Sequence, residues 1–267
     1  MKISIFTTMT NPEERMDPWK ESLACYEDFA DEVIVVGENF KNEFTWSDIG
    51  KMFTEGLNRS TGDWVLWMDI DNLFHEKDID SLRNGLEKFS HSPSIALPKI
   101  QIFTPERFSV KSVICRAFNK RDYPEIKLNG GGDLCLPTLN GKLIKPEDVP
   151  KIKVPIWNYD TVFRTKEVIS QDRARFARAW YREFGNYGER GGEEPNQAYQ
   201  AWYSMVEKRY KSHTLKLKIN EHPKYIKDKI NNLGEDQFGY NGFGLQNNQN
   251  IPLMNYLRGY KDKIKYL

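Results

Sequence analysis

The feature that most constrains this chain is a regular alternation of short apolar runs with amphipathic segments over its first hundred residues. The segments between the runs start near Asp17-Pro18 and at Thr45, and they carry apolar residues at helical spacing. The runs are rich in β-branched and aromatic residues and have the length of buried strands: Lys2–Thr8, Glu32–Gly37 and Trp64–Met68. Strands that alternate with helices predict an α/β layer architecture, with a mostly parallel sheet flanked by helices.

The pattern becomes less regular farther along the chain. A helix is predicted over 76–89 and a strand over 95–103, whereas the many prolines and glycines of 104–155 predict short strands and loops. Helices are predicted again over 164–184 and 196–211. The last part is polar, aromatic and glycine-rich, and we expect it to be an irregular tail closed by a short helix. We therefore divide the chain into residues 1–103, a second half of the same domain over 104–230, and a tail over 231–267.

Composition excludes several classes of protein. With 39% hydrophobic and 13% aromatic residues among 267, the chain can build a sizeable core. It has no run of the ~18 apolar residues that a membrane span needs and no apolar stretch typical of a signal peptide, so we expect no transmembrane segment and a cytoplasmic location. Cys25, Cys115 and Cys135 are widely separated and include no CxxC pair, so neither a disulfide framework nor a zinc site is expected.

The net charge of +1 conceals an uneven distribution. Residues 150–267 contain 21 basic and 13 acidic residues, a net charge of +8, which leaves −7 for the first 149. One interpretation is a metal-binding acidic half joined to a half that faces an anionic partner. The other is ordinary variation in surface composition.

Two carboxylates follow directly after the third apolar run, in the segment Gly62-Asp63-Trp64-Val65-Leu66-Trp67-Met68-Asp69-Ile70-Asp71. Ligands of open α/β sheets bind at the carboxyl ends of the strands, where Asp69 and Asp71 would project. Mg²⁺ and Mn²⁺ take oxygen ligands, commonly one or two carboxylates together with phosphate oxygens of a substrate. The DxD pair is therefore typical of a metal–diphosphate site, although such pairs also arise in solvated acidic turns.

These residues resemble the pattern of nucleotide-sugar glycosyltransferases of the GT-A fold, in the broad family-two group. In that family a first strand ends in Thr near an Asn, a second ends in an acidic residue, a basic residue lies on the next helix, and a strand then runs into DxD. The corresponding residues here are Thr7 and Thr8, Asn11, Glu38, Lys51, Asp69 and Asp71. Glu38 stands where Asp is usual and Lys51 where Arg is common, and both keep the charge. The resemblance implies a GT-A-type, Rossmann-like sheet with a C-terminal helical extension.

The resemblance also implies roles for these residues. Thr7, Thr8 and Asn11 would line the nucleoside pocket, and Glu38 would accept hydrogen bonds from the base or ribose. Lys51 would face the diphosphate. Asp71 would hold Mn²⁺ or Mg²⁺, while Asp69 would bind the ribose or the metal. The donor implied by the family is a nucleoside-diphosphate sugar, with a UDP-sugar as the first expectation.

Two later segments resemble the same family more faintly. Val154-Pro155-Ile156-Trp157-Asn158-Tyr159-Asp160 departs from a family segment that carries a histidine where Asn158 stands, and Asp160 is a possible oxygen ligand for the metal in its place. Glu221-His222-Pro223 matches a His-Pro motif that implies a metal ligand. As an alternative, His222 caps a helix that begins at Pro223.

An inverting transfer needs a general base near the acceptor hydroxyl. In the family this base is a carboxylate of the middle region. Asp133 is our first choice, because it follows Gly130-Gly131-Gly132, where the backbone can approach a ligand closely. Glu125 is the second choice, and a polar turn without a catalytic role is the alternative.

We therefore expect a metal-dependent glycosyltransferase that moves a hexosyl group from a nucleotide sugar to a hydroxyl acceptor, with inversion. The acceptor is either a glycan or DNA with a hydroxymethylated base, since Arg175, Arg178 and Arg182 share one helical face and suit a polyanion. That face is otherwise a solvated helix surface. The alternative function is a non-catalytic protein of the same fold that binds a nucleotide sugar or a polyanion.

Overall fold

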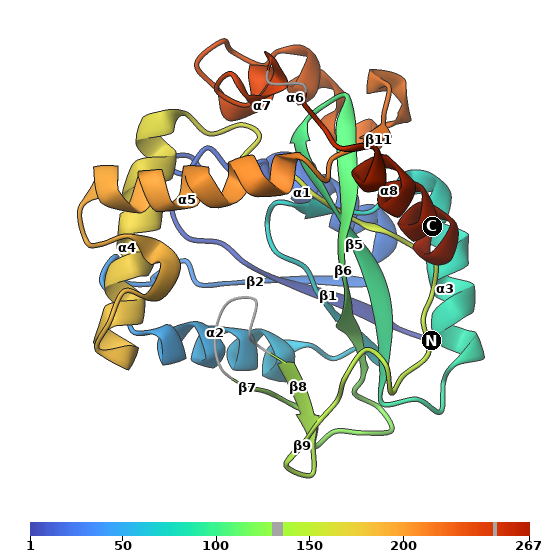
Figure 1. Ribbon diagram of the computed structural model, residues 1–267. Helices are drawn as coiled ribbons and strands as arrows, with labels where there is room; N and C mark the ends of the chain where they lie inside the picture. The colour runs from blue at the N-terminus through green and yellow to red at the C-terminus, as the bar shows by residue number, and fades with distance from the viewer. Residues whose placement is uncertain (130–135, 248–249) are drawn as a thin grey trace.

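The computed structural model describes residues 1–129, 136–247 and 250–267, and a mixed sheet lies at its centre (Figure 1). A short strand, β11 (Leu215–Lys216), pairs with β6 (Arg107–Asn119), and a separate small sheet contains β7 (Lys127–Asn129), β8 (Leu136–Leu139) and β9 (Lys142–Leu143). The main sheet has, in spatial order, the strands β2 (Glu32–Val36), β1 (Ile3–Thr8), β3 (Trp64–Trp67), β6 (Arg107–Asn119), β5 (Ser94–Thr104), β10 (Ile156–Asn158) and β4 (Asn72–Leu73).

Helices cover both faces of the sheet. α1 (Trp19–Phe29) and α3 (Ile79–Lys88) pack on the face that carries Ile3 and Ile5. On the opposite face, α2 (Trp46–Arg59) packs against Phe6. Because successive side chains of a strand point to opposite faces, β1 contributes to both cores. The strand–helix alternation predicted for the first hundred residues is present in the structure.

The C-terminal half adds mainly helices. α4 (Lys166–Phe184), α5 (Pro195–Tyr210) and the short α7 (Phe238–Asn241) share a third, aromatic-rich core. α6 (Lys227–Asn231) and α8 (Leu253–Tyr266) follow, and α8 is longer than the short closing helix expected from the sequence. Within the described ranges, no helix is long and apolar enough to cross a membrane.

The helices that flank the site begin at residues suited to cap them. Thr45 precedes α2, and its backbone N–H donates to the Asp48 carboxylate at 2.9 Å. Thr165 precedes α4, and its side-chain oxygen accepts from the backbone N–H of Val168 at 3.4 Å. Such caps satisfy N–H groups that have no partner inside the helix. At its other end α4 stops at Gly185, whose φ of 69° is in the left-handed region that glycine tolerates.

The expectation of a mostly parallel sheet is wrong. Parallel pairing joins β2, β1 and β3, and also β5 and β10. In contrast, β6 is antiparallel to β3, β5 and β11, and β10 is antiparallel to β4. The reason is the connection between β5 and β6, which contains only Pro105 and Glu106. A parallel pair needs a crossover of a dozen or more residues, whereas a connection of two residues allows only a hairpin.

The long strand β6 lies in the region where the sequence predicts short strands and loops. Most of its first eight residues are partly exposed and only the last five are all buried, so the hydrophobic pattern that marks a buried strand is weak. The strand inserts between β3 and β5, and residues from both sides of position 103 therefore alternate within one sheet.

The contact between α2 and β1 leads to a first prediction. A Cβ added at Gly56 would lie 2.3 Å from the Phe6 ring, in a core where the ring is fully buried. Replacing a helical glycine by alanine normally stabilises by up to about 1 kcal/mol. Here overpacking should cost about 1–3 kcal/mol and outweigh that gain. We expect Gly56→Ala to lower the Tm, measured by thermal unfolding.

The matched control is Glu55→Ala, on the exposed side of the same helix. It should change the free energy of unfolding by no more than about 0.5 kcal/mol. An unchanged or higher Tm for Gly56→Ala would show that α2 does not pack on β1 as closely as the structure has it.

Candidate active site

The DxD segment lies at the bottom of a cleft of about 270 Å³ at the carboxyl end of β3. We call this the main cleft. Thr8 from the end of β1 and Asn158 from β10 line it beside Asp69 and Asp71. The backbone N–H of Tyr159 donates to the carbonyl of Asp71 at 2.9 Å and ties the DxD segment to the end of β10. The arrangement agrees with the rule that ligands of α/β sheets bind beyond the carboxyl ends of the strands.

Asp69 is neutralised by side chains from the β5–β6 hairpin. Its Oδ2 lies 3.0 Å from Arg116 Nη2 and 3.5 Å from Lys99 Nζ, and Asn72 Nδ2 donates to the same oxygen at 2.9 Å. Arg116 in turn stacks over the Trp67 ring, 3.4 Å from its centre. Burial opposes ionisation of Asp69, but the charges of Arg116 and Lys99 outweigh it and hold the pKa of this carboxyl below its usual value.

Asp71 has a different environment although it is only two residues away. Burial, followed by repulsion from the Asp160 and Asp69 carboxylates, raises its pKa to about 7. Asn158 Nδ2 donates to Asp71 Oδ1 at 3.2 Å. A bound cation would stabilise the ionised form of a carboxyl that lies this close to other carboxylates.

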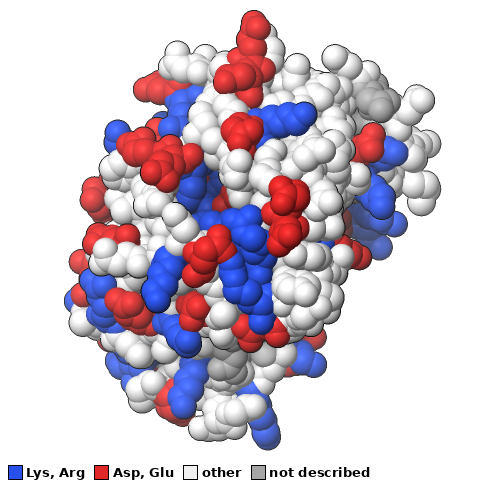
Figure 2. Space-filling view, turned by 90° about the vertical axis from the view of Figure 1, so that its left-hand side faces the viewer, with Lys and Arg blue, Asp and Glu red and all other residues white. Residues whose placement is uncertain are grey.

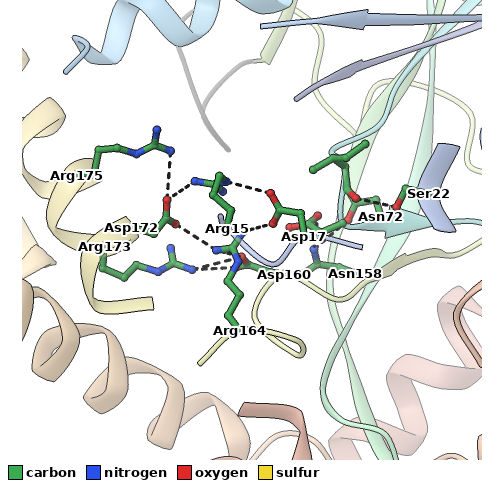
Figure 3. Close-up of polar contacts among 12 residues, drawn as sticks. Arg15, Asp17, Ser22, Asn72, Asn158, Asp160, Arg164, Asp172, Arg173 and Arg175 are labelled. Atoms are coloured by element: carbon green, nitrogen blue, oxygen red, sulfur yellow. Dashed lines mark hydrogen bonds and ion pairs between the residues drawn. The ribbon is translucent and has the colours of Figure 1, made fainter. Parts of the chain in front are cut away.

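Four arginines line the same cleft, and we call them the arginine cluster: Arg15, Arg164, Arg173 and Arg175 (Figure 3). Arg164 is only 2% exposed, and its Nη2 lies 2.5 Å from Asp17 Oδ1 while its Nη1 lies 3.2 Å from Asp172 Oδ2. Arg15 bonds both of these aspartates. The chain from Asp17 through Arg164 to Asp172 therefore links the segment before α1 to α4.

Arg173 and Arg175 extend this network along α4. Arg173 Nη2 lies 3.1 Å from Asp160 Oδ2, and Arg175 Nη2 lies 3.3 Å from Asp172 Oδ1. Asp160 also lies 3.5 Å from Arg164. Although burial opposes its ionisation, Arg173 and Arg164 lower the pKa of Asp160 to about 2.

The four arginines exceed their three aspartate partners, Asp17, Asp160 and Asp172. Burial, together with the neighbouring charges of Arg15 and Arg164, lowers the pKa of Arg175. Among the described residues, the buried Nε atoms of Arg164 and Arg173 have no hydrogen-bond partner. The arginine cluster therefore carries more positive charge than its aspartate partners neutralise, which suits a polyanionic ligand in the main cleft. Figure 2, viewed from the side on which α4 lies in Figure 1, shows basic side chains gathered in the middle of that face, with acidic ones beside them.

A second cleft of about 390 Å³ adjoins the main cleft. The two share Asp160, Arg173 and three further lining residues. Four aromatic residues from α2, β5, α4 and α5 line the second cleft: Trp46, Phe103, Phe176 and Trp202. Its lining also includes four basic residues, Lys111, Arg173, Arg190 and Arg209. Asp160 is the carboxylate that lines both clefts.

The residues assigned to nucleoside binding from the sequence are only partly brought together. Thr8 lines the main cleft, whereas Thr7 is fully buried, and its Oγ1 has no partner among the described residues. Glu38 and Lys51 line a neighbouring hollow of about 470 Å³, and Phe40 and Met52 line both this hollow and the main cleft. Asn11 is exposed, with a φ of 45°.

His222 lies outside the main cleft. It is fully buried, its Nδ1 accepts from the hydroxyl of Tyr159 at 2.8 Å, and its Nε2 donates to the carbonyl of Pro105 at 2.8 Å. Burial lowers the pKa of His222 to about 4. Both ring nitrogens are thus engaged within the protein, so we leave His222 out of the metal site that the sequence predicts.

Of the two candidate bases, Glu125 is the one that lies among the described residues. Asp133 lies outside the described residues and stays a prediction. Glu125 is exposed near β7 and lines neither cleft.

Of the arginine cluster, the sequence predicted an anion-binding role only for Arg175, and it gave no sign of the cations around Asp69. Arg15 and Asp172 are 157 positions apart, and no local pattern relates them. The sequence places a helix start near Asp17-Pro18, and the cap position of α1 is Pro18, whereas the Asp17 carboxylate binds arginines. Arg178 and Arg182, expected on an open basic face, both pair with Glu43.

The described residues include no group of three or more His, Cys, Asp or Glu side chains that would by itself enclose a metal ion. The donor set fits a different arrangement. Asp69 and Asp160 are each neutralised by two cations, whereas Asp71 has the raised pKa of a carboxyl that a cation would stabilise. One carboxylate completed by phosphate oxygens and water is an ordinary way to bind Mg²⁺.

No protein-family model matches the chain, and no curated protein sequence matches it. Similar solved structures include TarS from S. aureus, which is 10% identical with a TM-score of 0.37 over 98% of this chain and 55% of that one. TarS 1–349 in complex with UDP-GlcNAc is 13% identical with a TM-score of 0.37, covering 99% of this chain and 92% of that one. The chain thus spans about half the length of the longer TarS chain. This likeness is loose and does not assign the chain to a family.

The environment of Asp71 predicts a pH-dependent stability. An unfolded aspartate has a pKa near 4, whereas the folded Asp71 has a pKa of about 7, so the folded state binds the proton more tightly. The associated stability is present below about pH 4 and is lost as the pH rises through 7. Because Asp71→Asn resembles the protonated form, its Tm should exceed that of the wild type by more at pH 8 than at pH 4, measured with a chelator present.

Asp80→Asn, an exposed substitution on α3, serves as the control and should change the Tm little. If the difference between Asp71→Asn and the wild type is the same at both pH values, the carboxyl is not crowded as described.

Proposed function

We propose that this protein is a glycosyltransferase that moves a sugar from a nucleoside-diphosphate donor to a hydroxyl group of an acceptor. The observation that carries this proposal is the pairing, in one cleft, of the cationic arginine cluster with the Asp71 carboxyl. A diphosphate suits both features, because guanidinium groups bind its oxygens and a divalent cation can bridge it to a carboxylate. The motif order around Asp69 and Asp71 supports the same function.

The donor would bind with its diphosphate in the main cleft, and the nucleoside would extend toward the hollow of Glu38 and Lys51. Mn²⁺ or Mg²⁺ held by Asp71 would neutralise charge on the leaving diphosphate. Asp69 stays ionised beside Arg116 and Lys99 and can accept hydrogen bonds from the ribose. A UDP-sugar is the first donor to test.

The acceptor would bind in the second cleft, where its four aromatic residues could contact the apolar face of a sugar ring. Asp160 lies where the two clefts meet and is ionised at neutral pH, and its pKa of about 2 reflects its pairing with Arg173 and Arg164. A bound diphosphate that engages these two guanidinium groups would make the carboxylate more basic. In an inverting transfer the acceptor oxygen would bond to the anomeric carbon as the bond to the diphosphate breaks, and the hydroxyl proton would pass to a carboxylate. We assign the role of proton acceptor to Asp160 and do not include Asp160 among the metal ligands. A glycan acceptor is favoured over DNA, because Arg178 and Arg182 are paired with Glu43.

The role of Asp71 is tested by turnover. Purified protein is given a panel of nucleotide sugars with Mn²⁺, with Mg²⁺ or with a chelator, and release of the nucleoside diphosphate is measured. We expect metal-dependent release, reduced by Asp71→Asn by about 10²-fold or more, because the charge that offsets the leaving group is lost. Asp80→Asn is the matched control and should be as active as the wild type.

Near-normal turnover by Asp71→Asn would refute the metal assignment. Binding of a nucleotide sugar without any release, even with acceptors present, would favour the alternative of a non-catalytic binding protein.

The role of Asp160 is tested by separating binding from chemistry. Asp160→Asn keeps the size of the side chain but removes the proton acceptor, so transfer should fall by about 10²–10⁴-fold. The affinity for the nucleoside diphosphate, measured by calorimetry, should stay the same or rise, since the arginines that Asp160 partly neutralises remain and are freed for the anion. A large loss of diphosphate affinity with unchanged turnover of bound donor would show that Asp160 only positions Arg173 and Arg164.

A further inference from the structure

The C-terminal helix α8 presents an apolar surface that nothing in the proposed reaction uses. Its outward side carries five large apolar residues, each between 57 and 73% exposed, which we call the apolar stripe: Leu253, Met254, Leu257, Tyr260 and Ile264. Most are spaced by three, four or seven positions, so they share one side of the helix. Large apolar side chains gathered at one place on a surface mark an interaction site more often than scattered ones do.

The opposite side of α8 is held firmly on the body of the protein. Gly259 is buried, and a Cβ there would lie 2.3 Å from Thr214 Oγ1, so the helix backbone lies directly on this segment. Asn255 Nδ2 donates to the carbonyl of Lys211 at 2.8 Å, and Lys153 Nζ donates to the carbonyl of Ile264 at 3.0 Å. The apolar stripe therefore lies on a helix whose opposite side is packed against the rest of the protein.

Positive charge borders the apolar stripe on both sides. With 3.6 residues per turn, Arg258, Lys261 and Lys265 lie along one edge and Lys263 along the other, and all four are exposed. The single acidic residue of α8, Asp262, is on the side turned toward the body and is partly buried. Long basic side chains beside an apolar stripe are the pattern of helices that lie in the surface of an anionic bilayer.

A lysine-lined hollow of about 450 Å³ lies at the C-terminal end of the same helix. Lys151, Lys153 and Lys265 line it together with Tyr266, and Glu147 is its acidic member. Three ammonium groups around a hollow next to Ile264 suit an anionic headgroup whose acyl chains would lie along the apolar stripe.

We propose that α8 docks this protein on a membrane surface that contains anionic phospholipid. A second copy of the chain is a poorer occupant, because two apolar stripes facing each other would also bring the four basic residues of each helix together. α4, which lines the main cleft, and α8 lie on opposite sides of the molecule in Figure 1. A docked molecule therefore keeps its main cleft open to the aqueous side. This proposal does not depend on the proposed function.

The test is flotation of the purified protein with vesicles of phosphatidylcholine alone or of equal parts phosphatidylcholine and phosphatidylglycerol. The wild type should float with the anionic vesicles and not with the neutral ones, and added salt should weaken binding. Leu257→Ser with Ile264→Ser should reduce partitioning roughly tenfold or more, because two apolar side chains no longer enter the bilayer. Lys261→Gln with Lys265→Gln should reduce it by about fivefold for each lysine.

Leu143→Ser with Tyr240→Ser, two exposed apolar residues outside α8, is the matched control and should float like the wild type. Thermal unfolding verifies that each variant folds, and the lysine variant still tests the proposal if the serine variant does not fold.

The proposal is overturned if the wild type does not float with anionic vesicles, if it floats equally with neutral ones, or if both α8 variants bind as the wild type does. It is also overturned if light scattering shows a dimer that the serine variant dissociates, since the apolar stripe is then covered by a second copy. Donor turnover is assayed separately without vesicles and is expected to be unchanged in the α8 variants.

Discussion

The ion-paired contact of Arg164 with Asp17 and Asp172 is the interaction on which the rest of the site depends. It joins the segment before α1 to the first turns of α4 across the main cleft, and all three side chains are nearly inaccessible to water. Breaking a buried ion pair by removing one partner costs about 3–5 kcal/mol, because the remaining charge is left without compensation. The same network orients Arg15, Arg173 and Arg175 toward the cleft, so the charges that hold the two halves together also form the surface that an anionic ligand meets (Figure 3).

The two aspartates of the DxD segment show how position decides the chemistry of identical side chains. Asp69 faces Arg116 and Lys99 from the β5–β6 hairpin and is held ionised. Asp71 faces other carboxylates, so its pKa rises to about 7. The hairpin that makes the sheet mixed therefore also determines which of the two carboxyls would gain most from a bound cation.

Charge and apolar surface are separated on this molecule. The main cleft and its arginines lie on the side of α4, while the apolar stripe and its bordering lysines lie on α8, on the opposite side (Figure 1). The basic residues of the C-terminal half thus fall into three groups. Some line the main cleft, Arg178 and Arg182 pair with Glu43, and those on α8 border the apolar stripe. A net charge summed along the sequence cannot distinguish these three uses, because it contains no information about which residues meet.

The sequence by itself determined the order of strands and helices in the first hundred residues, the position of Asp69 and Asp71 at a strand end, and the starts of the helices. These features rest on periodicity, capping and turn residues, which act between neighbours in the chain. Only the tertiary structure decided the place of β6, the pairing of Arg15 with Asp172, the separation of Glu38 and Lys51 from the main cleft, and the burial of His222 between Tyr159 and Pro105. Each of these depends on contacts between residues far apart in the sequence, where desolvation and charge pairing are set by the packing of whole elements and no local pattern carries the information.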